Sequence, residues 1–148
     1  MTDFIIQATK KAWTDIMTPL SILKHEAIMS VTKTGMTLKC VDAGHVSLAS
    51  ADIHSRDFQS FVVRKKQKVG IDLSNFLIAI KRFDKADTME LRYDGTQFLI
   101  TKVVETGTDQ VITMKPSDPE RMTDTDPAFP QIAFDTSLLI QTSLVNEA

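Results

Sequence analysis

The sequence predicts an α+β domain in which one unit, a strand followed by a helix and an antiparallel meander, occurs twice, with the helices on one face of the sheet. Apolar strands are predicted to begin at Ile5, Val69 and Ile132, which are 64 and 63 residues apart, and each precedes a helix-capping residue and an amphipathic segment. Two hairpin turns, marked by Gly35 and Gly95, lie 60 residues apart. We therefore expect two complete units and the beginning of a third.

The first unit is predicted to open with a strand over residues 4–8 and a helix over residues 10–18, for which Thr9 is the N-cap. Pro19 is expected to end or kink this helix, because proline lacks the backbone N–H and clashes with the preceding turn. Apolar side chains recur at the spacing of a core-facing helix stripe, at Trp13, Ile16, Met17 and Leu20.

A hairpin of strands over residues 27–32 and 36–41 is predicted next, and it leads into the stretch 41–53. This stretch begins as a turn, since Gly44 can adopt positive φ without steric cost. Residues 46–53 then form a strand with neither face strongly polar, which predicts a position inside a sheet. His45 lies at the mouth of this strand, where a shallow groove is expected beside apolar Val41, Val46 and Leu48.

The second unit repeats the order after a strand over residues 58–63 and a basic turn over residues 64–68, which we interpret as solvated surface. Its helix has core positions at Leu73, Phe76, Leu77, Ile80 and Phe83. The Asp94-Gly95 pair marks the tight turn of its meander. The strands of this unit are predicted over residues 69–71, 88–93, 97–103 and 111–115. A loop is predicted over residues 105–110.

Composition changes after residue 115. Residues 116–130 hold four of the five prolines and four acidic residues, which is typical of an extended connector rather than a packed element. Residues 131–148 resemble the strand and helix that open each unit, but no meander follows them. We therefore expect a first domain over residues 1–115, a connecting loop over residues 116–130, and the incomplete start of a second domain over residues 131–148.

The overall composition excludes several classes of protein. The net charge of −2 means that any contact with nucleic acid must come from a local basic patch. One cysteine among 148 residues rules out an internal disulfide and fits a reducing compartment. No apolar run has membrane-spanning length and no signal-peptide pattern is present, so we expect a cytosolic or nuclear protein without a membrane partner.

Catalysis is the alternative that must be weighed against a binding function. Cys40, Asp42 and His45 could suggest a thiol nucleophile with a base, but Cys40 shares the face of Met36 and Leu38, which points into the core. His45 and His54 are nine residues apart on a strand and face opposite sides, which disfavours a metal site. We therefore expect no enzymatic activity, no cofactor and no metal.

Four stretches of the sequence carry a resemblance to a known family. The order of elements with residues 41–48 after the first hairpin resembles the sliding clamps of the proliferating cell nuclear antigen (PCNA) family. Val69-Gly70-Ile71-Asp72-Leu73 is similar to the strand before the second helix of that family, and residues 80–88 are similar to the basic end of that helix in archaeal members. Residues 129–135 resemble the end of its interdomain connector and the following strand.

The resemblance implies a non-catalytic processivity factor. Family subunits contain two such domains and close head-to-tail into a ring, in which helices line a hole around duplex DNA and sheets form the outside. Short peptide motifs of DNA polymerase, nucleases, ligase and the clamp loader dock beneath the connector, so these proteins, duplex DNA and other clamp subunits are the implied partners. The implied location is the nucleoid-associated cytoplasm of an archaeal or viral system, or the nucleus of a eukaryote.

The family resemblance also implies three groups of site residues in this chain. The groove for the partner motif would be formed by Val41, His45, Val46, Leu48, Phe129 and Pro130. The DNA-facing cations would be Lys10, Lys11, Lys81, Arg82 and Lys85, which contact phosphates without reading bases. The edge that pairs with a neighbouring subunit would be Val111, Ile112, Thr113, Met114 and Lys115.

A second interpretation stays open, because the chain is roughly half the length of a usual family subunit. The chain could be a short clamp paralogue that binds an intact clamp or its clients as a regulator, without encircling DNA. Self-assembly and the binding of a client peptide distinguish this regulator from a ring-forming subunit or half-subunit.

Overall fold

The computed structural model describes residues 2–42, 44, 47–104, 107–117 and 139. Within these residues the chain forms two copies of a strand, a helix and three further strands, with one short strand between the copies. The first copy consists of β1 (Phe4–Thr9), α1 (Lys10–Leu23), β2 (Glu26–Thr32), β3 (Gly35–Val41) and β4 (Leu48–His54). The second copy consists of β6 (Gln67–Asp72), α2 (Leu73–Ile80), β7 (Thr88–Tyr93), β8 (Phe98–Val104) and β9 (Gly107–Met114). Between them lie a 3-10 turn over Ser55–Asp57 and β5 (Ser60–Val63).

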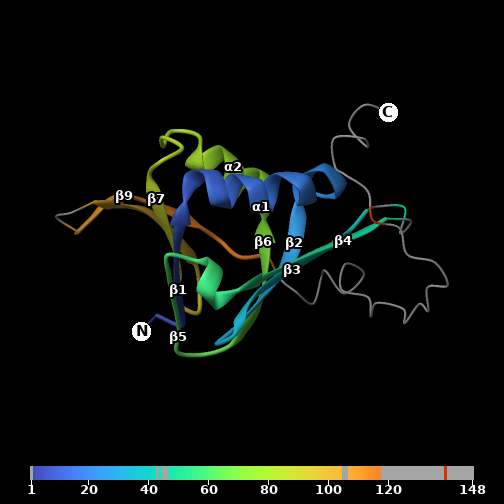
Figure 1. Cartoon of the computed structure of the whole chain (residues 1–148), viewed down its shortest axis with the longest axis horizontal. Helices are drawn as coiled ribbons and strands as arrows, with labels where there is room; N and C mark the ends of the chain where they lie inside the picture. The colour runs from blue at the N-terminus through green and yellow to red at the C-terminus, as the bar shows by residue number, and fades with distance from the viewer. Residues whose placement is uncertain (1, 43, 45–46, 105–106, 118–138, 140–148) are drawn as a thin grey trace.

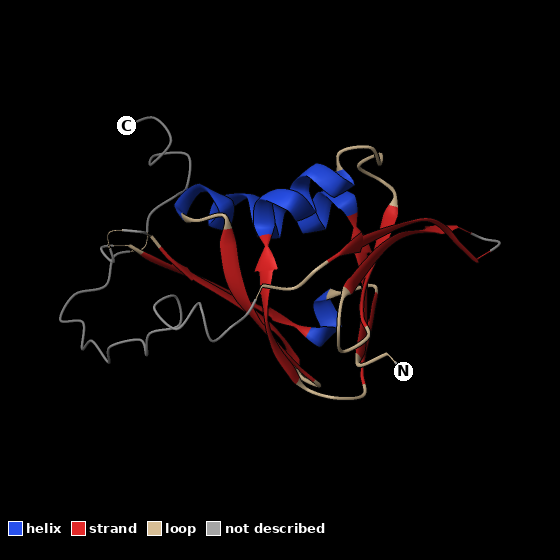
Figure 2. Ribbon diagram, turned by 180° about the vertical axis from the view of Figure 1, so that it is seen from behind, coloured by secondary structure: helices blue, strands red, loops and turns tan. Residues whose placement is uncertain are grey.

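The strands form two antiparallel sheets, and α1 and α2 lie together on one side of both (Figures 1 and 2). The order in the first sheet is β5-β1-β7-β8-β9, and the order in the second is β4-β3-β2-β6. The opening strand of each copy therefore pairs with the meander of the other copy: β1 pairs with β7, and β6 pairs with β2. The predicted repeat and the α+β class are confirmed, although the strands divide into two sheets.

Both helices begin as the sequence predicts. Thr9 caps α1, since its side chain accepts a hydrogen bond of 3.1 Å from the backbone N–H of Ala12. Asp72 caps α2 in the same way, at 2.9 Å from the N–H of Asn75. The prediction that Pro19 ends or kinks α1 is wrong about the end, because the helix continues through Pro19 to Leu23. Leu20 is buried and Leu23 packs on the core. The free energy gained by burying this last turn therefore outweighs the cost of the helix hydrogen bond that Pro19 cannot donate.

Two strand predictions also require correction. The strand after the first hairpin was expected inside a sheet, but β4 is an edge strand and pairs only with β3 among the described strands. Its outward face is polar, with Ser50, Asp52 and His54 exposed. The opposite face, which carries Ala49, Ala51 and Ile53, packs on the core. The predicted loop over residues 105–110 is wrong over residues 107–110, because β9 begins at Gly107 and continues the β8 ladder past an irregularity near Lys102; residues 105 and 106 lie outside the described residues.

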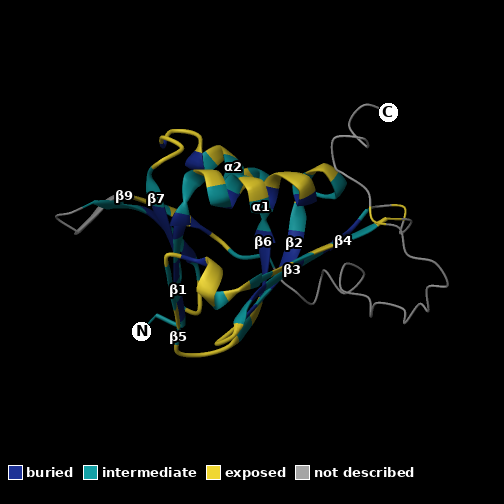
Figure 3. Ribbon diagram, viewed as in Figure 1, coloured by how far each residue is buried: buried dark blue, intermediate teal, exposed yellow. Residues whose placement is uncertain are grey.

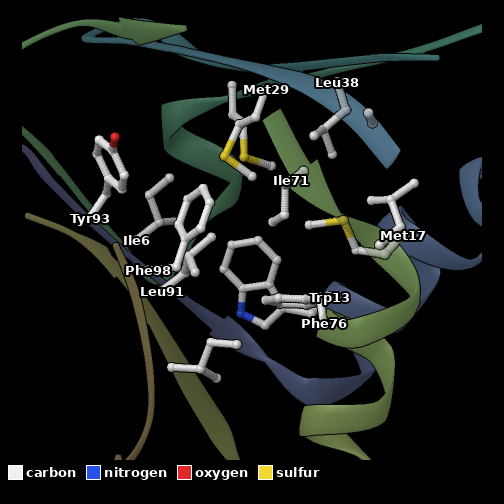
Figure 4. Packing of buried hydrophobic residues seen from close by; sticks show 14 of the residues in the cluster. Ile6, Trp13, Met17, Met29, Leu38, Ile71, Phe76, Leu91, Tyr93 and Phe98 are labelled. Atoms are coloured by element: carbon white, nitrogen blue, oxygen red, sulfur yellow. The ribbon is translucent and has the colours of Figure 1, made fainter. Parts of the chain in front are cut away.

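The core fills the space between the two sheets and beneath the helices (Figures 3 and 4). Trp13 of α1 is fully buried, and its ring centroid lies 5.6 Å from that of Phe76 in α2 and 5.9 Å from that of Phe58. The indole Nε1 donates a hydrogen bond of 3.2 Å to the backbone oxygen of Met89 in β7. Trp13 thus joins both helices to the larger sheet.

The outward face of the larger sheet carries a buried ion pair. Alternation along β7 places Met89, Leu91 and Tyr93 in the core and Glu90 on the opposite face, yet Glu90 is only 4% exposed. Its carboxylate accepts hydrogen bonds from Gln7 Nε2 at 2.7 Å and from Arg92 Nη2 at 2.6 Å. The charge of Glu90 is therefore balanced by contacts within the sheet itself.

The β7–β8 turn forms at the predicted Asp94-Gly95 pair. Gly95 has φ of +96°, a conformation that glycine adopts readily. The Asp94 carboxylate accepts hydrogen bonds from the backbone N–H and hydroxyl of Thr96 and from the N–H of Gln97. These bonds favour the ionised carboxylate and lower the pKa of Asp94 to about 2.

The chain after β9 is described as far as Ser117. Its backbone N–H and oxygen form hydrogen bonds of 2.9 and 3.2 Å with Gly70, which places Ser117 beside the outer edge of β6. The expected connector and second-domain start, apart from residues 116, 117 and 139, lie outside the described residues, so this division of the chain remains a prediction. None of the described helices is long and apolar enough to cross a membrane.

Candidate nucleic-acid surface and docking groove

The structure brings the predicted DNA-facing cations to one end of the helical layer. Lys10 and Lys11 start α1, whereas Lys81, Arg82 and Lys85 follow the end of α2, and antiparallel packing of the helices places these ends together. An open groove of about 450 Å³ lies between the helices there. Four of the five predicted cations line it: Lys10, Lys11, Lys81 and Lys85.

Lys10 holds the end of α2 in place. Its Nζ donates hydrogen bonds to the backbone oxygens of Lys81 and Phe83, where unsatisfied helix carbonyls concentrate negative partial charge. The backbone N–H of Lys10 also donates to the oxygen of Asp87, at 2.8 Å. Two of the three ammonium protons are thereby used, so Lys10 positions the neighbouring cations more than it offers its own charge.

Lys11 differs from the other cations because it has an acidic neighbour on its own helix. Its Nζ lies 2.7 Å from Asp15 Oδ2, one helical turn away, and both side chains are largely exposed. Such an exposed pair contributes at most about 0.5 kcal/mol and is readily exchanged for another anion. Lys11 therefore remains available at the rim of the groove.

The cations Lys81, Arg82 and Lys85 are exposed, and none of them forms an ion pair within the part of the chain that the structure describes. The loop that carries them is held at its start by the Lys10 hydrogen bonds and at its end by the Asp87 carboxylate, which accepts from the N–H of Asp84 at 2.9 Å and lies 3.4 Å from Lys102 Nζ. A fixed loop with exposed cations suits contact with phosphate oxygens.

The rest of the helical layer carries few charges. The α2 sequence has no charged residue, and α1 has none after Asp15. Ile22 of α1 and Ile78 of α2 are 81% and 61% exposed, and yellow patches run along both helices in Figure 3. Within the two helices themselves, positive charge is therefore confined to the end at which α1 begins, whereas Lys24, the C-cap of α1 at the opposite end, is partly buried.

Replacing Lys10 by methionine is expected to lower the free energy of unfolding by about 1–2 kcal/mol, because two charge-assisted hydrogen bonds to the end of α2 are lost. The matched control is Lys11→Met, which removes only an exposed ion pair and should cost less than about 0.5 kcal/mol. Urea unfolding followed by circular dichroism measures both changes. Equal effects of the two substitutions would contradict the positioning role of Lys10.

The predicted docking groove is described only in part. Val41 and Leu48 pair across β3 and β4, and Val41 is buried on the outward face of the smaller sheet, away from the core. His45, Val46, Phe129 and Pro130 lie outside the described residues. The structure thus places Val41 and Leu48 side by side, and the groove remains a prediction.

The predicted subunit edge lies on an edge strand. Among the described strands β9 pairs only with β8, and the Val111 side chain is 61% exposed. Met114 is buried, and Lys115 follows the end of the strand. The structure adds β4 as an edge of the other sheet, which the sequence analysis missed although its alternating Ser50, Asp52 and His54 indicate a solvated face.

Cys40 is buried, as the sequence predicts from its shared face with Met36 and Leu38. Burial raises the pKa of its thiol, although the charge of Lys24 acts in the opposite direction. A buried thiol with a raised pKa is a poor nucleophile. Among the described residues, no group of three or more His, Cys, Asp or Glu side chains gathers at metal-binding distance.

Known structures share this arrangement of two sheets and two helices. The model superimposes on the PCNA chain in the structure titled "C-terminal region of FEN-1 bound to A. fulgidus PCNA" with a TM-score of 0.78 and 17% identity, over 88% of this chain and 51% of that one. For PCNA from Entamoeba histolytica the TM-score is 0.77 and the identity 21%, over 91% and 54% of the two chains. The fold is therefore that of a DNA-clamp domain.

Sequence comparisons identify the family. The family model "Proliferating cell nuclear antigen, N-terminal domain" matches residues 11–123, and the chain belongs to this family. The DNA polymerase sliding clamp of Thermococcus onnurineus is 28% identical over 60% of this chain and 36% of that protein. The sliding clamp of Nitrosopumilus maritimus is 25% identical over 86% and 49%. The chain thus spans between about a third and a half of the length of these relatives.

Proposed function

We propose that this chain is a subunit or half-subunit of a non-catalytic sliding clamp, a ring that encircles duplex DNA and serves as a docking platform for replication and repair proteins. The family match to the PCNA N-terminal domain is the observation that carries the proposal. The chain would act with chromosomal DNA, in the cytoplasm of an archaeal or viral system or in the nucleus of a eukaryote.

The DNA-facing part of the proposal rests on Lys81, Arg82 and Lys85. Their exposed charges can attract phosphates of any sequence, which allows a ring to slide. Lys10 would hold their loop in position, and Lys11 would add a contact at the rim. Since the middle of the helical layer is nearly uncharged, the duplex would be contacted mainly at one end of this layer.

Ring assembly would use the free edges of the two sheets. The backbone groups along the outer side of β9 offer a ladder to a strand of a neighbouring subunit. Val111→Glu should weaken this pairing by placing a charge on the exposed edge, whereas Thr18→Glu, which adds the same charge at an exposed position of α1, is the matched control. Light scattering measures the assembly, and a strict monomer in the parent chain would contradict independent ring formation.

The proposed clients are DNA polymerase, nucleases, ligase and the clamp loader, each bound through a short peptide motif. One of the similar structures is titled as a FEN-1 C-terminal region bound to PCNA, which supports that FEN-1 region as the first probe peptide. The predicted site contains the Val41–Leu48 pair together with His45, Val46, Phe129 and Pro130. A labelled client peptide should bind Phe129→Ala more weakly than the parent chain.

Affinity for duplex DNA tests the nucleic-acid surface. The Lys81→Gln/Arg82→Gln/Lys85→Gln variant should lose at least tenfold in affinity at low salt, and the slope of log K against log[salt] should fall by about 2–3, because three phosphate contacts disappear. The matched control, Lys33→Gln/Lys65→Gln/Lys66→Gln, removes the same charge at the far end of the molecule. Equal losses in both variants would show that net charge alone governs binding and would contradict the proposed surface.

A second candidate function is supported by the apolar part of the helical layer. The exposed Ile22 and Ile78 and the scarcity of charge between them suit contact with protein better than contact with DNA. In this case the chain would be a short paralogue that regulates an intact clamp or its clients without encircling DNA. Binding to an intact clamp in the absence of both DNA affinity and self-assembly would favour this function.

A further inference from the structure

The end of the molecule opposite the helices carries a second cluster of cations that the proposed function does not use. Arg64, Lys65 and Lys66 are exposed in the turn between β5 and β6, and Lys33 is exposed in the nearby β2–β3 turn. We call these four residues the basic tip. None of them forms an ion pair within the described part of the chain.

The β5–β6 turn, which carries three of the four residues of the basic tip, is held in place by hydrogen bonds to Asp3. The N–H groups of Arg64 and Lys65 donate to the backbone oxygen of Asp3, at 2.8 and 3.1 Å. The Asp3 carboxylate accepts a hydrogen bond of 2.6 Å from Gln67 Nε2, which anchors the other side of the turn. The turn is therefore fixed while its cations extend into solvent, so a ligand would not have to order the backbone on binding.

Two shallow grooves adjoin the basic tip on the smaller sheet. One, of about 340 Å³, lies where β2 ends and β6 begins, and is lined by Lys66, Gln67 and Lys68 on one side and by Ser30, Val31 and Thr32 on the other. The second, of about 330 Å³, shares Ser30 and Thr32 and extends over Thr34 and Thr37 to Asp52 and His54. Together they form a path across the sheet with cations at one end, hydroxyl groups along it and a carboxylate at the other.

We propose that this path, from the basic tip across Ser30 and Thr32, binds an acidic segment of a partner polypeptide. Cations at one end and Asp52 at the other complement a peptide whose negative charge is concentrated at one end. The hydroxyl groups between them can donate to and accept from peptide groups.

Nucleic acid fits the same surface less well. The residues that line the two grooves include no Phe, Tyr or Trp, so bases would find no aromatic ring on which to stack. The Asp52 carboxylate, which accepts from Thr37 Oγ1 at 2.7 Å, would also repel a continuous phosphate backbone. A peptide can place neutral residues there.

The location suggests which polypeptide would use the surface. Val41 and Leu48 of the predicted docking groove lie on the same sheet, at the opposite end of β3 and β4 from His54 and Thr34. The strands between these ends are about 20 Å long. A client bound by its motif at the Val41 end could therefore place an acidic flank of roughly six to eight residues on the basic tip, a part of the inference that rests on the proposed docking function.

The experiment measures binding of a fluorescein-labelled octapeptide of four glutamates followed by four glycines, which lacks any docking motif, by fluorescence anisotropy. The Lys33→Gln/Lys65→Gln/Lys66→Gln variant is expected to bind about tenfold more weakly than the parent chain, since three exposed charge contacts are removed. The matched control is Lys81→Gln/Arg82→Gln/Lys85→Gln, which should bind the peptide with unchanged affinity. All six residues are exposed, and equal melting temperatures would verify that each variant is folded.

An octamer of thymidylate serves as the second probe. It should bind the parent chain more weakly than the acidic peptide does at the same salt concentration, or its binding should depend on the helical-layer cations instead. Unchanged peptide affinity in the basic-tip variant would overturn the inference, as would tighter binding of the thymidylate octamer that is lost in this variant. Either result leaves the duplex-DNA measurement on the helical layer, and therefore the proposed clamp function, unaffected.

Discussion

Substitution of Trp13 by alanine is expected to lower the free energy of unfolding by about 3–5 kcal/mol, the range for removing a large aromatic side chain from a packed core. Trp13 is fully buried, contacts the rings of Phe58 and Phe76, and donates to the Met89 oxygen at 3.2 Å. Its removal would leave a cavity at the point where both helices meet the larger sheet. Because three elements surround this cavity, they cannot all shift to fill it.

Urea unfolding followed by far-ultraviolet circular dichroism measures this effect, because the fluorescence of the only tryptophan disappears in the variant. Trp13→Phe is the matched control. It keeps the aromatic contacts with Phe58 and Phe76 but loses the hydrogen bond to Met89, so it should cost about half as much. A loss of less than about 1 kcal/mol in Trp13→Ala would contradict the central position of this side chain.

Substitution of Arg92 by leucine is expected to destabilise the protein by about 2–4 kcal/mol. Glu90 is almost completely buried. Without Arg92 its carboxylate would retain the hydrogen bond from Gln7 but would have no balancing charge. The Arg92 side chain is 36% exposed, which places the expected cost below that of a fully buried pair.

The double variant Glu90→Leu/Arg92→Leu separates the lost attraction from the cost of an unpaired charge. Since it removes both charges, it should be more stable than Arg92→Leu alone, although it contains one more substitution. Thermal unfolding of the parent, both single variants and the double variant completes the cycle. If the double variant is the least stable of the four, the burial of Glu90 is not the source of the effect.

The sequence predicts most of the fold because apolar periodicity and turn residues act locally. Cys40 is buried where its face with Met36 and Leu38 places it, and the turn forms at Asp94-Gly95. The errors occur where distant contacts override local signals. Leu20 and Leu23 gain enough burial to extend α1 past Pro19, and pairing with β8 extends β9 back to Gly107.

The candidate site was predictable only in outline. Helical spacing places the cations off the apolar stripes, but it could not indicate that Lys10 donates to the backbone of Lys81 and Phe83, more than 70 residues away in sequence. Nor could alternation predict that Glu90 is buried, because its burial depends on Arg92 and Gln7 folding over the same face. Assignment of the family needs the order of elements, since no single stretch of the chain carries a specific motif.

The pairing of β1 with β7 and of β6 with β2 has a consequence for the origin of the domain. Neither half contains a complete sheet of its own, because each lends its first strand to the other. An ancestral single unit would therefore have been stable only as an intertwined dimer of identical chains, and gene fusion would have converted that dimer into one polypeptide. On this view the modern domain is a domain-swapped pair made permanent by the peptide bonds between β4 and β6.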